Sequence, residues 1–225
     1  MAATYGQFCA VATALDVVGD RWTLLVVREL LTGPRRYGEL TRDLPGIATN
    51  LLAGRLRDLE AAGLVETVPG AGDARTRTYR LTGAGQGLRP VVEALARFGI
   101  GLLPEDAAGL AFRPQWLTLA LEILLIPGAL DRELVVRFDL RTADDGTSPV
   151  WLRLDADGVH TTSPDEVPAP DVVVAGDAAA LVAAVRDPGR ARELAAAGRL
   201  GVGGEPDARR RLAAALGGAA QNASR

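Results

Sequence analysis

The clearest pattern of apolar and polar positions in the chain lies in residues 49–59. Three leucines recur there at positions i, i+4 and i+7, namely Leu52, Leu56 and Leu59. Side chains at this spacing share one side of a helix, so the pattern predicts a helix with one buried face. Asn50, Gly54 and Arg57 fall on a different face, which the pattern leaves exposed.

A shorter helical pattern precedes this helix at residues 37–44, and a tight turn separates the two. Pro45 disfavours a helical conformation for the residue before it, and Gly46 permits a sharp change of direction. Thr49 is the expected N-cap of the second helix, and Gly63 is placed to end it. Two helices joined in this way predict a helix-turn-helix.

A hairpin is expected directly after the second helix. Residues 64–68 and 78–81 have the composition of strands, and residues 69–77 form a glycine-rich connection that carries Arg75 and Arg77. A hairpin in this position is the wing of a winged helix. Its two arginines would reach phosphates or a minor groove beside the helix.

The exposed face of the second helix has the chemistry of a DNA-reading surface. Asparagine pairs with adenine edges in the major groove, and arginine pairs with guanine edges or holds phosphates. The candidate contacts to a double-stranded DNA operator are Arg36, Thr49, Asn50, Ala53, Arg55, Arg57, Arg75 and Arg77.

Five short motifs in chain order make a more specific pattern. They are CAVA at 9–12, VGDRWTLL at 18–25, RYGEL at 36–40, LRDLE at 56–60 and YRLT at 79–82. This set resembles the HxlR family of bacterial winged helix-turn-helix regulators over about residues 5–100. The resemblance implies a homodimer that binds a near-palindromic operator, with segment 8–18 pairing the subunits and residues 20–31 forming the core helix.

The apolar positions support two of these assignments. Residues 20–31 are apolar on nearly all sides of a helix, with Trp22, Leu25 and Leu30 on one side and Leu24 on another, so we expect this helix to be buried. Residues 90–103 have apolar side chains at helical spacing and suit a dimer interface.

The spacing of apolar residues changes from a helical to an alternating pattern in the second half of the chain. Residues 134–141 and 150–155 alternate apolar and polar side chains and predict two antiparallel strands, with a turn at residues 144–146. Further strands are expected at 159–162, 171–175 and 200–203, and helices at 114–126, 177–186, 188–197 and 206–216.

This order of elements, with Asp157-Gly158 in a turn and a glycine-rich segment at 198–204 before the last helix, resembles the sterol carrier protein-like fold over residues 115–218. Members of that fold enclose an apolar cavity between a sheet and its helices. The resemblance implies a site for a hydrophobic small-molecule effector, lined by Trp116, Leu119, Leu134, Val136, Phe138, Trp151 and Leu152. Alternatively, the domain's own side chains fill the cavity and the domain only stabilises a dimer.

We therefore expect an α+β chain of two domains. Residues 1–103 form a winged helix-turn-helix domain for DNA binding and dimerisation, and residues 104–225 form the sterol carrier protein-like domain. The first domain holds 12 Arg against 10 acidic residues, for a net charge of +2, and the second holds 13 against 18, for −5. The asymmetry favours nucleic-acid contact by the first domain.

The counts of cysteine and histidine limit the chemistry. One cysteine excludes an intrachain disulfide and a zinc site built on several thiolates, and one histidine leaves a Ser-His-Asp or multi-histidine metal site without enough parts. Asp155, Asp157 and His160 cluster within a predicted hairpin, where we interpret them as turn chemistry. We expect no enzyme activity, no metal and no cofactor.

Cys9 has two interpretations. It is either a small buried residue at a helix start or subunit contact, or a redox or electrophile sensor. Some members of the resembling family use a cysteine at this place, and a thiolate near a helix N-terminus is activated.

The chain has no apolar run of roughly 18 residues and no basic segment followed by an apolar core at its start, so we expect a cytoplasmic protein without a membrane partner. The expected function is that of a transcription repressor whose second domain senses a hydrophobic effector by a population shift. Two alternatives are a regulator triggered at Cys9 with a structural second domain, and a lipid carrier or enzyme whose winged domain is an adaptor.

Overall fold

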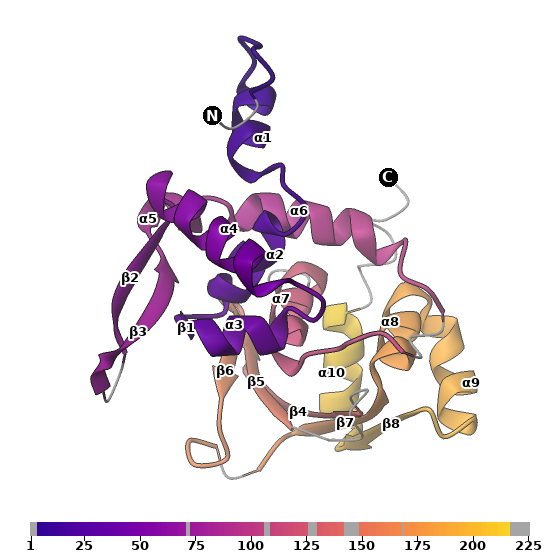
Figure 1. Cartoon of the computed structure of the whole chain (residues 1–225). Coiled ribbons are helices and arrows are strands. Elements are labelled where there is room, and N and C mark those ends of the chain that lie inside the picture. The colour runs from indigo at the N-terminus through magenta and orange to yellow at the C-terminus, as the bar shows by residue number, and fades with distance from the viewer. Residues whose placement is uncertain are drawn as a thin grey trace. The chain divides into compact units, whose positions relative to one another are not determined.

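The computed structural model describes residues 4–70, 73–105, 109–125, 130–141, 149–167 and 169–216 (Figure 1). The side chains of residues 73–75, Pro114 and Pro188 also lie outside the description. The chain divides into two compact units, Met1–Ala94 and Leu95–Arg225. This division falls inside a helix, ahead of the domain boundary expected after residue 103.

The N-terminal unit combines helices with a small antiparallel sheet. Its helices are α1 (Ala10–Val18), α2 (Thr23–Leu31), α3 (Tyr37–Asp43), α4 (Thr49–Ala61), α5 (Gly83–Gln86) and the first part of α6 (Arg89–Ile100). Its strands are β1 (Arg35–Arg36), β2 (Val65–Gly70) and β3 (Asp73–Leu81), in the order β1-β3-β2. Strands β2 and β3 form an antiparallel hairpin directly after α4, which confirms the winged helix-turn-helix.

Helix α4 has the predicted buried stripe, because Leu52, Leu56 and Leu59 are all buried. Its C-terminal end also follows the prediction. Gly63 has φ +69°, and the backbone N–H of Leu64 donates to the carbonyl of Leu59 at 2.9 Å. This hydrogen bond closes the helix in the way that a glycine just past the last turn allows.

Two details of the N-terminal unit differ from the sequence prediction. The N-cap of α4 is Ala48, with φ −70° and ψ 142°, and Thr49 is the first helical residue. The side chain of Ile47 is buried and fixes the turn, so that helical backbone starts at Thr49, one residue earlier than predicted. Helix α2 begins at Thr23, later than predicted, and Leu25 is 36% exposed, so this helix is not buried on all sides.

The C-terminal unit is built on one five-stranded sheet. Its strands are β4 (Leu134–Arg141), β5 (Val150–Asp155), β6 (Gly158–Thr162), β7 (Val172–Asp177) and β8 (Leu200–Gly204). The strand order is β6-β5-β4-β7-β8, with β4 and β7 parallel and the other neighbours antiparallel. The unit also contains α7 (Pro114–Leu124), α8 (Ala178–Arg186), the 3₁₀ helix η1 (Pro188–Arg190), α9 (Ala191–Ala196) and α10 (Pro206–Leu216).

One face of this sheet packs against the helices. Helices α7 and α10 lie beside the sheet (Figure 1), and Leu121 of α7, Leu181 of α8 and Leu212 of α10 belong to the same buried cluster as Val136 and Leu154 of the sheet. The other face carries the alternate residues of each strand, most of them polar. The α+β class is therefore confirmed, while the turn expected at residues 144–146 lies outside the described residues.

Candidate nucleic-acid interface

The turn between α3 and α4 holds the two helices in a fixed arrangement. Leu44 and Ile47 of the turn are buried in the core of the N-terminal unit. The hydroxyl of Tyr37, at the start of α3, donates a hydrogen bond to the carbonyl oxygen of Thr49 at 2.7 Å. These contacts anchor the N-terminal end of α4 and leave its polar face to solvent.

The polar face of α4 has small side chains in its middle and carries the amide of Asn50 and the guanidinium of Arg57. Asn50 is exposed, and its Oδ1 accepts a hydrogen bond from the N–H of Leu51 at 2.9 Å. A Cβ added at Gly54 would lie 4.0 Å from Nη2 of Arg57, so this guanidinium lies over the helix beside Gly54. Ala53 is half-buried. Small side chains in the middle of this face allow close approach to a DNA groove.

Arg55 is placed differently from Arg57. Its Nη1 donates to the carboxylate of Asp20, in the turn between α1 and α2, and lies 3.1 Å from Oδ2 of Asp58. The Arg55 side chain is 22% exposed. Arg57 is exposed and forms no ion pair with any residue that the structure describes. The structure therefore separates the two arginines that the sequence groups together as DNA contacts.

Asp20 was not predicted as a member of this site. Asp20 and Arg55 are 35 positions apart in the chain, and they belong to different helical patterns. Nothing in the local sequence around either residue indicates that they meet, because their contact depends on how α1, α2 and α4 pack.

Two further sets of predicted DNA contacts lie before and after α4 in the sequence, namely Arg36 and the arginines of the wing. Arg36 is the N-cap of α3, where its backbone N–H donates to Glu39 at 2.6 Å and its side chain is exposed. In the wing, Arg77 is exposed and pairs in register with Pro69, whereas the side chain of Arg75 lies outside the described residues. The neighbouring Arg80 forms an ion pair with Glu66 at 2.8 Å.

The residues predicted to line an effector site are divided by the structure. Leu134, Val136, Phe138 and Leu152 are fully buried in the cluster between the sheet and its helices. Trp151 follows the opposite strand face, where the guanidinium of Arg137 lies 5.8 Å from its ring centre. Trp151 and Leu152 therefore do not line one site.

Two further members of that predicted set lie on α7. Leu119 is buried but is not part of the cluster formed by Leu134 and Phe138. Trp116 is half-buried and packs edge to face against Phe112, with ring centres 6.5 Å apart. The structure brings together the four strand residues and places these two apart from them.

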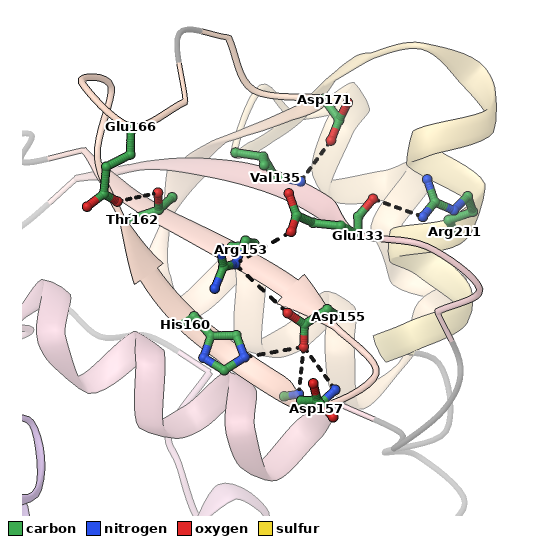
Figure 2. A network of polar contacts seen from close by, with 11 residues as sticks. Glu133, Val135, Arg153, Asp155, Asp157, His160, Thr162, Glu166, Asp171 and Arg211 are labelled. Carbon is green, nitrogen blue, oxygen red and sulfur yellow. Dashed lines mark hydrogen bonds and ion pairs between the residues drawn. The ribbon is translucent and has the colours of Figure 1, made fainter.

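The hairpin between β5 and β6 holds the acidic residues and the histidine that sequence analysis interpreted as turn chemistry. Oδ1 of Asp155 accepts hydrogen bonds from the N–H groups of Asp157 at 2.9 Å and Gly158 at 3.1 Å, and lies 3.2 Å from Nε2 of His160 (Figure 2). The carboxylate thus closes the turn, as the sequence interpretation holds. Arg153 is within 3.9 Å of Asp155 and 3.6 Å of Glu133.

Cys9 is the N-cap of α1 and is exposed, which differs from the buried interpretation of this residue. The backbone N–H groups of Ala12 and Val11 in the first turn of α1 lower the pKa of its thiol. Cys9 also lines an apolar groove of about 700 Å³ in the N-terminal unit, together with residues of α1 and with Leu64 and Leu88.

Within the described ranges, no helix has the length and apolar character needed to cross a bilayer. In the same part of the chain, His, Cys, Asp and Glu side chains form no group of three or more that could hold a metal ion.

A helix-turn-helix followed by a two-stranded wing, with polar side chains on the second helix, defines a winged helix-turn-helix protein. Residues 17–107 match the family model described as HxlR-like helix-turn-helix. The chain belongs to this family. Four of the five sequence motifs lie within the match, and the motif CAVA at 9–12 precedes it.

Two relatives illustrate the similarity. An HTH-type transcriptional regulator of Synechocystis is 33% identical over 102 residues, which are 45% of this chain and 76% of that protein. An HTH-type transcriptional regulator of Mycobacterium tuberculosis is 44% identical over 95 residues, which are 42% of this chain and 60% of that protein. The solved structure of PA1607 has 37% sequence identity and a TM-score of 0.42, and the match covers 48% of this chain and 78% of that one.

Proposed function

We propose that this chain is a DNA-binding transcription regulator in which the polar face of α4 enters a major groove. The observation that carries this proposal is the exposed pair of Asn50 and Arg57 opposite the buried leucine stripe of α4. Arg77 of the wing adds a second exposed guanidinium to the same unit. Asn50 and Arg57 suit base edges, and Arg77 suits a phosphate or minor groove. Repression follows when the bound protein occludes a promoter.

The proposed DNA-bound form is a homodimer. Large apolar side chains are exposed along α6 and just beyond it at Val91, Leu95, Phe98 and Leu102, and Phe98 is 72% exposed. Their spacing of four, three and four residues places them on one side of a helix. Phe8, just before α1, and Val11 on α1 are also exposed. Large apolar side chains exposed at helical spacing indicate a protein contact, and a dimer would bind two half-sites one helical turn apart.

The dimer proposal is tested by Phe98→Glu, because a charged side chain in an apolar contact is strongly unfavourable. Sedimentation should then show a monomer where the unchanged chain is a dimer. Leu110→Glu is the matched control, since Leu110 is exposed but lies outside α6. Equal sedimentation of the Phe98→Glu variant and the unchanged chain would exclude α6 as the contact.

For the C-terminal unit we propose that it senses a hydrophobic small molecule. The proposal is supported by the resemblance to the sterol carrier protein-like fold, and by a sheet whose apolar face, with Val136, Phe138 and Leu152, lies under α7, α8 and α10. An effector that binds one conformation better shifts the population toward it, and operator affinity changes by the differential binding energy, typically about 1 to 3 kcal/mol.

Fluorescence anisotropy on duplexes that tile the region upstream of the chain's own coding sequence tests both parts of this proposal. Specific binding that an apolar extract of the host cells weakens or strengthens is the expected result. Specific binding that ignores the extract would overturn effector sensing and retain the regulator. Absence of binding at low salt would overturn the regulator and favour a lipid carrier.

A second candidate trigger is Cys9, and its exposure together with the lowered pKa of its thiol favours this alternative. A lowered pKa increases the thiolate fraction at neutral pH, and the thiolate is the reactive form. Cys9→Ser should abolish any response of DNA binding to an oxidant or an electrophile. A response that survives this substitution would exclude Cys9, because the chain contains no other cysteine.

A further inference from the structure

The turn between α1 and α2 lies against the helix-turn-helix at two separate points. Asp20 in this turn is paired with Arg55 of α4. Trp22, at the end of the turn, lies beside Gly46, where an added Cβ would be 4.0 Å from the tip of the indole. Gly46 belongs to the connection between α3 and α4. The α1–α2 turn therefore contacts the recognition helix and lies close to the turn that precedes it.

The backbone of the α1–α2 turn is itself tightly placed. The N–H of Gly19 donates to the carbonyl of Leu15 at 2.8 Å, and a Cβ added at Gly19 would overlap that carbonyl oxygen. The N–H of Thr23 donates to the carbonyl of Asp20 at 3.0 Å. Asp20 is thus held between the last turn of α1 and the first turn of α2.

Arg55 lies on the side of α4 that faces this turn. Residues two positions apart on an α-helix are separated by about 160° around its axis, so Arg55 and Arg57 point in nearly opposite directions. Arg57 lies with Asn50 on the exposed face. The pairing of Arg55 with Asp20 and Asp58 gives its guanidinium two carboxylate partners within the protein.

We infer that Arg55 is a positioning residue, whose pairing with Asp20 fixes the orientation of α4 relative to the α1–α2 turn. This inference rests on the proposed DNA binding by α4. Because α1 carries part of the proposed dimer surface, the pair also fixes α4 relative to the subunit contact. The distance between the two recognition helices of a dimer, and hence operator affinity, then depends on Asp20 and Arg55 although neither residue contacts DNA.

This role and direct DNA contact predict opposite effects of removing Asp20. If Arg55 contacts phosphate, Asp20 competes with DNA for its guanidinium, and Asp20→Ala should tighten binding. If Arg55 positions α4, Asp20→Ala should weaken binding as much as Arg55→Gln does. Because one hydrogen-bonded charge pair is lost, DNA affinity should fall by about five- to tenfold.

The experiment measures anisotropy of the full chain on a duplex enriched by that chain from a randomised library, at several salt concentrations. The variants are Asp20→Ala, Arg55→Gln, Arg55→Lys and the double Asp20→Ala/Arg55→Gln, with Arg57→Gln for comparison. Glu60→Gln on α4 controls for the loss of one negative charge. Thermal unfolding of each variant shows that the chain is folded at the assay temperature.

The positioning role predicts four results. Asp20→Ala and Arg55→Gln weaken binding equally, the double variant is no weaker than either single one, and Arg55→Lys restores most of the affinity. The slope of log Kd against log salt stays unchanged in these variants, whereas Arg57→Gln lowers it by about 0.9 if Arg57 neutralises one phosphate.

Tighter binding by Asp20→Ala, or a slope lowered by about 0.9 in Arg55→Gln, would overturn the positioning role and make Arg55 a phosphate contact. Enrichment of no duplex by the unchanged chain would instead overturn the proposed DNA binding. The two failures are therefore distinguishable.

Discussion

Arg57 of the recognition helix and Arg77 of the wing differ from the arginines of the C-terminal sheet in what surrounds them. Arg57 and Arg77 are exposed and form no ion pair with the residues that the structure describes. On the polar face of the sheet, Arg137 pairs with Asp139 at 2.8 Å, and Arg153 lies between Glu133 and Asp155 (Figure 2).

This comparison shows that the number of arginines does not identify a DNA-binding surface. The two halves of the chain hold 12 and 13 arginines, which are nearly the same number. What separates Arg57 and Arg77 from Arg137 and Arg153 is whether a carboxylate of the protein lies beside the guanidinium. A guanidinium without such a partner remains available to release counterions from DNA, and a paired one stabilises the fold instead.

The largest expected effect is a loss of stability when the buried face of α4 is damaged, in contrast to the exposed arginines, whose removal should affect DNA binding only. Leu56→Ala removes a buried side chain from the leucine stripe of α4 and should lower the free energy of unfolding by about 2 to 5 kcal/mol. Urea denaturation followed by circular dichroism measures this loss. A change below about 0.5 kcal/mol, as is usual for surface positions, would show that the stripe is not the anchor of α4.

Removal of Arg57 and Arg77 together gives the next largest effect. Arg57→Gln/Arg77→Gln should weaken binding to an enriched duplex by roughly 10- to 100-fold, because two charged contacts are lost. The salt slope should fall by about 1.8 if each arginine neutralises one phosphate. The matched control is Arg137→Gln/Arg153→Gln in the sheet, which should leave both quantities unchanged. Equal losses in the two double variants would contradict the comparison.

A third experiment tests whether a paired carboxylate of the C-terminal unit is structural. Asp177 caps α8 by accepting the N–H of Ala180 at 2.6 Å and pairs with Arg199 at 3.1 Å. Burial opposes its ionisation, but these hydrogen bonds outweigh burial and lower the pKa of Asp177. Asp177→Ala should therefore reduce the free energy of unfolding by about 1 to 2 kcal/mol at pH 7.

The sign of the pH dependence follows from the lowered pKa of Asp177. A carboxylate with a depressed folded pKa stabilises the fold above its unfolded pKa, about 3.9 for Asp, and loses that contribution as pH falls through the folded value. The difference between Asp177→Ala and the unchanged chain should shrink when unfolding is measured at pH 3. A difference that is equal at pH 3 and pH 7 would show that the charge of Asp177 is not involved.

The smallest expected effect concerns Arg137 alone. This side chain lies over the ring of Trp151 and pairs with Asp139, and it is 34% exposed. Exposed ion pairs and cation–π contacts contribute about 1 kcal/mol or less, so Arg137→Gln should change the free energy of unfolding only slightly. Chemical denaturation with Trp fluorescence measures it. A decrease of the free energy of unfolding above about 3 kcal/mol would show that Arg137 supports the core and is not only a surface contact.

Much of the fold is present in local sequence patterns. The spacing of Leu52, Leu56 and Leu59 predicts which side of α4 is buried, and the glycine at position 63 predicts where it ends. Local patterns succeed here because helix periodicity and glycine conformation depend on neighbouring residues only. The sequence predicts the start of α4 one residue too late, because the burial of Ile47 decides where the turn becomes helical.

The candidate site was less predictable, because it depends on contacts between distant segments. The assignment of Arg55 to DNA missed its pairing with Asp20, which only the packing of three helices creates. The effector-site residues failed to group for a different reason. The alternation of β5 already places Trp151 and Leu152 on opposite faces, so strand periodicity was sufficient to separate them.

Hydroxyl-radical footprinting of the unchanged chain on its enriched duplex tests the central claim, that α4 of a homodimer binds operator DNA, most directly. The account predicts two protected backbone patches related by a two-fold axis, with centres about 10 base pairs apart. Both patches should weaken together in Arg57→Gln/Arg77→Gln and persist in Arg137→Gln/Arg153→Gln. One isolated patch would contradict the dimer, and uniform cleavage along the duplex would contradict DNA recognition by this fold.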